Sequence, residues 1–178
     1  MVHVTSTCII FHMKVVIAPQ AFKGSLSGAK AAEAIAEGVR HVLPDAKTTL
    51  VPVADGGDGT LEALVENTSG QVFTSHVNGP FMNPIEADWG VMGDGETAVI
   101  EMARASGLVL VPPGKRDPRH TTTFGTGQLI KEAINHGYRR IIVGMGGSAT
   151  NDGGAGMAKA LGVRFLDRNG SALQNGGA

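Results

Sequence analysis

A glycine-rich stretch, residues 143–162, constrains the fold of this chain more than any other part of its sequence. It reads VGMGGSATNDGGAGMAKALG and follows the β-branched run Ile141–Val143, which is typical of a short buried strand. After the glycines, apolar residues recur at helical spacing from Ala155 to Leu161, and Gly162 supplies a stop. The stretch therefore predicts a strand, a long glycine-rich connection and a helix.

That connection combines glycines with hydroxyl, amide and carboxylate side chains, which suits a phosphate group. Glycines let the backbone approach a ligand closely, and free N–H groups at a helix start attract anions. Asp152 is placed either to cap the helix or to hold Mg²⁺, and a connecting loop without a ligand is the alternative for the whole stretch. The candidate phosphate-binding residues are Gly146, Gly147, Ser148, Thr150, Asn151 and Gly153.

Charge and composition argue against several classes of function. The formal net charge is −1, no basic run is present and aromatic residues make up 4% of the chain, which disfavours nucleic acid and anionic membranes as partners. Cys8 is the single cysteine, so no internal disulfide can form, and this fits a reducing cytoplasm. The 26 glycines fall in discrete loops between apolar runs, as in a globular α/β protein.

The first twelve residues, MVHVTSTCIIFH, lack the cationic start and the small-residue cleavage site of a secretory signal. The sequence MKVVIAP, from Met13, reads as the first buried strand of an α/β protein. We therefore expect residues 1–12 to be a poorly ordered leader and residues 13–178 to form the folded part.

From Met13 onward, predicted strands alternate with predicted helices, and Gly93–Gly95 joins two strands as a hairpin. We expect an α/β fold with an open, mostly parallel, Rossmann-like sheet flanked by helices, and an antiparallel hairpin region. The expected strands are residues 14–18, 47–53, 71–78, 86–92, 97–101, 141–143 and 163–166. The expected helices begin after Ser27, near Leu61, at Met102, after Gly127 and near Ala155.

Charged residues follow the first two predicted strands. Lys23, after the first, can reach a ligand or remain a solvated surface lysine. Asp55 and Asp58, after the second, are candidates for binding Mg²⁺ or accepting a substrate proton, although aspartate is also favoured at a helix start. Because loops at the carboxyl ends of parallel strands converge, we expect Lys23, Asp55 and Ser148 in one cleft.

A second anion-binding pattern precedes the helix that contains Leu129. Residues 121–127 read TTTFGTG, and this mixture of hydroxyls and glycines makes Gly125 and Thr126 further candidates for phosphate binding.

A dinucleotide-binding site is the competing hypothesis for the glycine-rich stretch. The residues GMGGSA from Gly144 match the spacing of the dinucleotide fingerprint, and Asp167 lies near the distance expected of its ribose-binding acid. The fingerprint needs a helix that starts within the glycines, whereas Asn151–Gly154 delay the helix here. A nucleotide-dependent oxidoreductase is therefore the weaker hypothesis.

Five longer motifs carry a family resemblance. They are VIAPQAFKGSLS at 16–27, PVADGGDGT at 52–60, GDGETAVIEMARASGL at 93–108, FGTGQLI at 124–130 and GMGGSATNDGGAGMAKALG at 144–162. With them, the chain from Met13 onward resembles the N-terminal half of the bacterial type 1 glycerate kinases. The resemblance implies phosphorylation of D-glycerate by ATP with Mg²⁺, in a cleft between two α/β domains.

The resemblance also implies roles for individual residues. Lys23 would pair with a phosphate or with the glycerate carboxylate. Asp55 and Asp58 would bind Mg²⁺ or accept the hydroxyl proton, and Gly146–Asp152 would cradle phosphoryl oxygens. Asp152 is thus a catalytic candidate beside Lys23 and Asp55.

The chain departs from the family pattern in two ways. Gln20 and Ala21 stand where such enzymes usually have Asp-Ser, and Asp58 stands where Glu is usual. The family's chains are also considerably longer, so we expect an N-terminal fragment that binds ligand without turnover and self-associates through uncovered apolar surface. A non-catalytic association module is the alternative function.

Overall fold

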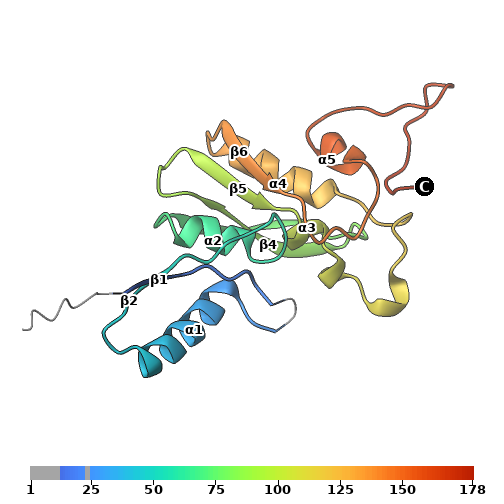
Figure 1. Cartoon of the computed structure of the whole chain (residues 1–178). Helices are drawn as coiled ribbons and strands as arrows, with labels where there is room; N and C mark the ends of the chain where they lie inside the picture. The colour runs from blue at the N-terminus through green and yellow to red at the C-terminus, as the bar shows by residue number, and fades with distance from the viewer. Residues whose placement is uncertain (1–12, 23–24) are drawn as a thin grey trace, which may run out of the picture. The chain divides into compact units, whose positions relative to one another are not determined.

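The structure, a computed structural model, describes residues 13–22 and 25–178, which form two compact units (Figure 1). The first unit ends at Pro52 and the second is Val53–Ala178, and each is described by itself. The expected leader, residues 1–12, and the candidate Lys23 lie outside the described residues.

The first unit is a βαβ motif. Strands β1 (Lys14–Ile17) and β2 (Lys47–Leu50) pair in parallel, and helix α1 (Gly28–Val42) connects them. Ser27 caps α1 as predicted, since its side chain accepts a hydrogen bond from the backbone N–H of Lys30 at 3.3 Å. The buried side chains of Ile17, Ala32 and Ala36 form the small core between helix and strands.

The second unit contains a four-stranded sheet in the order β3 (Gln71–Asn78), β4 (Pro84–Val91), β5 (Thr97–Glu101) and β6 (Arg140–Gly144). Strands β3, β4 and β5 pair antiparallel, and only β5 and β6 run parallel. The prediction of one mostly parallel sheet is therefore wrong for the described strands, although the predicted hairpin at Gly93–Gly95 is confirmed. The connections on either side of β4 are too short for a parallel crossover, whereas helices separate β5 from β6.

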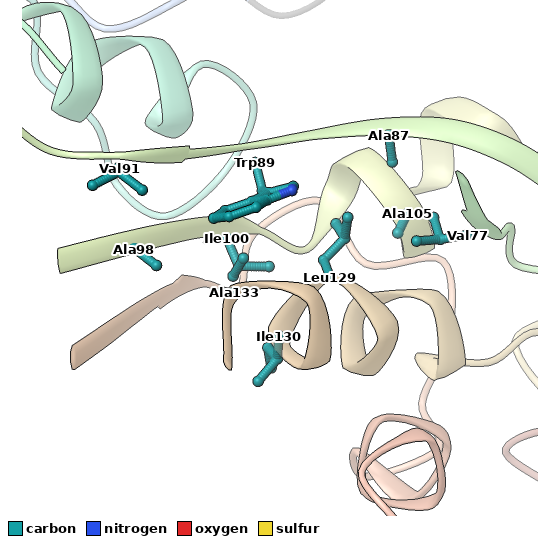
Figure 2. Close-up of a cluster of buried hydrophobic side chains, with 10 residues drawn as sticks. All are labelled: Val77, Ala87, Trp89, Val91, Ala98, Ile100, Ala105, Leu129, Ile130 and Ala133. Carbon is teal, nitrogen blue, oxygen red and sulfur yellow. The ribbon is translucent and has the colours of Figure 1, made fainter. Parts of the chain in front are cut away.

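The two faces of this sheet pack against different helices. Helix α4 (Phe124–Asn135) covers one face with Leu129 and Ala133, which Figure 2 shows on the side of the helix toward Ile100 of the sheet. Ile130 belongs to the same core cluster but points away from the strands. Helix α2 (Thr60–Glu66) contributes Leu61 and Val65 to a second cluster that contains Val99. Because successive strand residues point to opposite faces, β5 is buried along its whole length.

Shorter elements complete the second unit. They are α3 (Ala103–Ser106), two 3₁₀ turns (Leu108–Leu110 and Pro113–Lys115) and α5 (Ala155–Ala160). The strand predicted over residues 163–166 is absent and leaves a single bridge between Leu166 and Ala172, although the turn that begins at Asp167 is present. None of the described helices is both long and apolar enough to cross a membrane.

Candidate functional site

Two loops of the second unit meet at the end of the parallel strand pair β5 and β6. The glycine-rich loop, residues 145–154, follows β6, and the acidic loop, residues 55–59, precedes α2. The backbone N–H of Gly146 donates to the carbonyl oxygen of Gly56 at 2.6 Å. A Cβ atom added to Gly146 would lie 2.6 Å from the backbone nitrogen of Gly57, so the approach requires glycine here.

The acidic loop leaves both of its aspartates available to a ligand. Asp55 is exposed, and its Oδ1 accepts a hydrogen bond from the backbone N–H of Gly57 at 3.1 Å. Asp58 is half-buried, and no ion pair or hydrogen bond to another described residue engages its side chain. Gly56 and Gly59 have φ angles of 91° and 89°, which give the loop its tight curvature.

The predicted meeting of the acidic and glycine-rich loops thus occurs, but not for the predicted reason. Strand β2, which precedes Asp55, pairs with β1, whereas β6 pairs with β5 in a separate sheet. The loops come together through their own backbone contact and not as neighbouring ends of one parallel sheet. The predicted proximity of Lys23 to Asp55 and Ser148 remains a prediction, because Lys23 lies outside the described residues.

Asp152 is tied into the protein by hydrogen bonds to both of its carboxylate oxygens. Its Oδ2 accepts from the backbone N–H of Thr123 at 2.8 Å and of Gly156 at 3.1 Å, and its Oδ1 accepts from that of Gly154 at 3.0 Å. Burial raises the pKa of Asp152, but hydrogen bonds from Thr123 and Gly154 outweigh burial and lower that pKa below its ordinary value. Of the two roles expected for Asp152, the geometry shows the capping of α5.

The hydroxyl groups of the glycine-rich loop hold its shape. Ser148 Oγ donates to the carbonyl oxygen of Thr150 at 2.8 Å, and Thr150 Oγ1 donates to that of Thr121 at 2.6 Å. Ser148 and Asn151 are exposed, and Gly147 and Gly153 adopt φ angles of 72° and 63°. The left-handed turns at Gly147 and Gly153 and the exposed side chains of Ser148 and Asn151 leave these parts of the loop open to a ligand.

The two candidates from the second anion-binding pattern lie in the interior. The structure places residues 124–127 within α4 and not ahead of it, which corrects the predicted helix start. Thr126 is 1% exposed and shares a hydrogen bond of 2.8 Å with Ser106 Oγ, and Gly125 packs against the backbone of Asn78. In this geometry both residues belong to the packed interior of the second unit.

Sequence reasoning missed an ion pair at the carboxyl end of β5 between a buried carboxylate and a half-buried guanidinium. Glu101 is 2% exposed, and Nε of Arg104 lies 3.3 Å from its Oε1. Burial raises the pKa of Glu101, and hydrogen bonding to Leu61 and the charge of Arg104 offset part of that effect. The sequence did contain a signal, because Glu101 ends the apolar run TAVIE, which is typical of a buried strand. A carboxylate buried at that position needs partners that satisfy its charge.

A cavity of about 410 Å³ opens between the acidic loop and this ion pair. Its walls include carboxylates, one guanidinium and two apolar side chains, contributed by Asp58, Asp88, Glu101, Arg104, Val109 and Leu110. Across the described part of the chain, no group of three or more His, Cys, Asp or Glu side chains is arranged to hold a metal ion. A metal ion at the acidic loop would therefore need ligands beyond Asp55 and Asp58.

Over the described residues 143–162, the structure does not contain the strand, glycine turn and helix arrangement that a dinucleotide-binding site requires. Strand β6 ends at Gly144 and α5 begins only at Ala155, so the glycines of the fingerprint lie in a long loop and not at a helix start. Asp167 lies in a tight turn, where its backbone N–H donates to the carbonyl oxygen of Ser171.

The chain is thus an α/β protein whose glycine-rich loop follows one strand of a parallel pair. More particularly, it belongs to the glycerate kinase family, because the family's sequence profile matches residues 15–178. It is 56% identical over 165 residues to the glycerate kinase of Bacillus subtilis (strain 168) and 54% identical over 165 residues to the glycerate 2-kinase of Escherichia coli (strain K12). The family resemblance stated from the motifs is confirmed.

A solved structure supports the same assignment. The crystal structure of a candidate glycerate kinase 2 from Salmonella typhimurium LT2 matches with a TM-score of 0.79 and 51% identity, over 93% of this chain and 44% of that one. Each of the two sequence matches likewise covers 93% of this chain. The chain spans about 43% of the length of these two relatives.

Proposed function

We propose that this chain supplies the acidic loop and the phosphate-binding loop of an enzyme that transfers a phosphoryl group from ATP to D-glycerate. The family assignment and the names of the two relatives support the reaction. The observation that carries the proposal is the hydrogen bond of 2.6 Å from Gly146 to Gly56, because it holds carboxylates beside a glycine-rich loop. Phosphoryl transfer depends mostly on such positioning and on charge neutralisation.

The acidic loop fits a Mg²⁺ ion that is shared with substrate phosphates. Mg²⁺ is usually held by one or two protein carboxylates together with phosphate oxygens and water, and Asp55 and Asp58 provide such a pair. When bound, the ion would neutralise charge on the transferring group. Either carboxylate could instead accept the proton of the glycerate hydroxyl. Lys23 would pair with a phosphate or with the glycerate carboxylate.

The glycine-rich loop would cradle phosphoryl oxygens through its side chains and its remaining backbone N–H groups. The residues assigned to this role are Gly146, Gly147, Ser148, Thr150, Asn151 and Gly153. The N–H groups of Gly146 and Thr150 already donate to Gly56 and to Ser148 Oγ, so these two residues would shape the cradle. Asp152 would act by fixing the loop, because its oxygens already accept hydrogen bonds from Thr123, Gly154 and Gly156. Thr126 would support the loop through Ser106, whose carbonyl oxygen accepts from the N–H of Ala149, and Gly125 would allow α4 to approach Asn78.

A chimera tests the proposed function. Residues 15–178 would replace the matching segment of the Bacillus subtilis relative, and release of ADP that depends on glycerate would be followed with ATP and Mg²⁺. We expect turnover at a rate typical of kinases, about 1–100 per second. A folded chimera that binds Mg²⁺ and ATP but releases no ADP in response to glycerate would overturn the proposed substrate.

The 178-residue chain by itself is the matching control. The reaction needs donor and acceptor held in line in a water-poor cleft, and this chain spans less than half the length of its relatives. We expect it to bind ligand without glycerate-dependent turnover. Turnover at the rate of the chimera would show that the residues up to Ala178 suffice.

A further inference from the structure

Glu101 has no part in the reaction proposed above, yet it is the one charged residue with a fully buried side chain among the described positions. A carboxylate in such surroundings is costly unless other groups satisfy it. Two groups do so. The backbone N–H of Leu61 donates to Oε2 at 2.9 Å, and the guanidinium of Arg104 faces Oε1.

The hydrogen bond from Leu61 replaces a missing helix cap. The first N–H groups of a helix have no partner within it, and Gly59, at the N-cap position of α2, offers no side chain. Glu101 supplies the acceptor from a strand 40 residues along the chain. Because Gly59 is also the last residue of the acidic loop, fixing the first turn of α2 fixes that end of the loop.

Arg104 provides a second link to the same helical turn. Its guanidinium pairs with Glu62 in the first turn of α2, and it also lies 4.0 Å from a carboxylate oxygen of Asp88 on β4. Glu62 is next to Leu61, so Glu101 and Arg104 together hold α2 at two consecutive residues. One link goes through the backbone and the other through a side chain.

We propose that Glu101 is a positioning residue that, with Arg104, fixes the acidic loop against the glycine-rich loop by capping α2. We call these two links, from Glu101 to Leu61 and from Arg104 to Glu62, the clamp. The clamp acts on the end of the loop that contains Asp58, while the hydrogen bond from Gly146 holds the loop at Gly56. The proposal rests on the proposed function only for the identity of what the acidic loop binds. The clamp itself is a property of the chain.

Two substitutions separate the hydrogen bond from the charge. Glu101→Asp keeps the charge but shortens the reach to the Leu61 N–H, whereas Glu101→Gln keeps the length and an acceptor oxygen but loses the charge. Amide hydrogen exchange would be measured over residues 56–62 of the whole 178-residue chain. We expect exchange there to be about tenfold faster in Glu101→Asp and within about threefold of the unsubstituted chain in Glu101→Gln.

One further region of the chain and one further variant serve as controls. Exchange in α4 should stay unchanged in both variants, and Glu132→Gln, an acidic substitution on α4, should leave residues 56–62 unchanged. Equal exchange in the Asp and Gln variants would overturn the proposal, as would a uniform increase that includes α4. If Glu101→Asp does not fold, Arg104→Gln tests the second link, to Glu62, and unchanged exchange over residues 56–62 would overturn the clamp.

The chimera adds a functional measurement. Glu101→Asp should raise the Mg²⁺ concentration for half-maximal turnover several-fold and leave kcat at saturating Mg²⁺ within about threefold, because the loop is loosened while its ligands remain. A fall in kcat alone would contradict positioning of a metal-binding loop. A chimera without any turnover would refute the proposed function, and the exchange measurements would still decide the clamp.

Discussion

Gly146 shows how one residue can decide whether two loops meet. Its N–H donates to Gly56, and the space that a side chain would need is occupied by the backbone of Gly57. A methyl group at this position must move one backbone away from the other, since neither partner is a flexible side chain. The absence of a side chain therefore contributes directly to the proposed site.

Gly146→Ala should destabilise the protein by about 1–3 kcal/mol, because overpacking forces the backbone to shift. Urea denaturation would measure the change in the free energy of unfolding. Gly38→Ala is the matched control, since a Cβ at Gly38 on α1 meets nothing within 4 Å, and it should be neutral or stabilising by up to about 1 kcal/mol. Equal effects of the two substitutions would contradict the close approach.

Asp55→Asn in the chimera should lower turnover by about 10²-fold or more, because an amide binds Mg²⁺ less tightly and does not accept a proton at neutral pH. Steady-state release of ADP would measure the effect. Asp45→Asn, an exposed aspartate between α1 and β2, is the control and should leave turnover unchanged. Normal turnover in Asp55→Asn would limit Asp55 to its hydrogen bond with Gly57.

Helices α4 and α5 of the second unit are linked at their first turns by hydrogen bonds between side chains and backbone N–H groups. Asp152 connects the start of α5 with the segment before α4, and Thr123 Oγ1 accepts a hydrogen bond from the backbone N–H of Met157 at 2.9 Å. Neither Thr123 nor Gly154 caps its own helix with a side chain. The starts of both helices therefore depend on residues that are distant in the sequence.

The lowered pKa of Asp152 predicts a pH-dependent stability. The folded state stabilises the ionised form of Asp152, so this carboxylate adds to the free energy of unfolding. The added stability is complete above the ordinary aspartate pKa, about 3.9, and is lost as the pH falls through the lower pKa of the folded state. Asp152→Asn should lower the free energy of unfolding by about 1–3 kcal/mol at pH 7 and flatten its fall below about pH 4. Urea denaturation at several pH values measures the free energy of unfolding at pH 7 and its fall at low pH, with Asp45→Asn as the control. Parallel pH curves would show that Asp152 does not titrate in this way.

At the scale of the whole molecule, the described chain leaves large apolar side chains in contact with water. Met145 is 74% exposed and Val109 is 70% exposed. Both lie close in sequence to the hydrogen bond of 2.8 Å from Leu108 N–H to the carbonyl oxygen of Gly147. Exposed apolar residues next to a proposed site favour contact with another protein surface.

We expect the 178-residue chain to self-associate, as its uncovered apolar side chains suggest. Static light scattering across a concentration series should show a rising mean mass, and the double substitution Val109→Ser and Met145→Ser should reduce it. Substituting two exposed polar residues, Glu33 and Glu37 on α1, with Gln is the control. A monomer at every concentration would contradict the prediction.

Local patterns in the sequence determined most elements of this protein. Periodicity placed the strands and helices of both units, the hydroxyl of Ser27 marked a helix start, and Gly93–Gly95 marked a hairpin. The glycine-rich stretch predicted a strand, a loop and a helix, and all three are present. These features depend on a few neighbouring residues, so the sequence contains the information that fixes them.

Tertiary structure alone decided which distant elements pair and which partners the buried polar side chains have. The separation of β1 and β2 from the mixed sheet and the placement of Thr126 in the interior depend on packing between distant segments. The same holds for the cap that Glu101 gives to Leu61, 40 residues away. Contacts at such separations leave no periodic signal, because the partners of a buried carboxylate or hydroxyl are chosen by the folded backbone and not by adjacent residues.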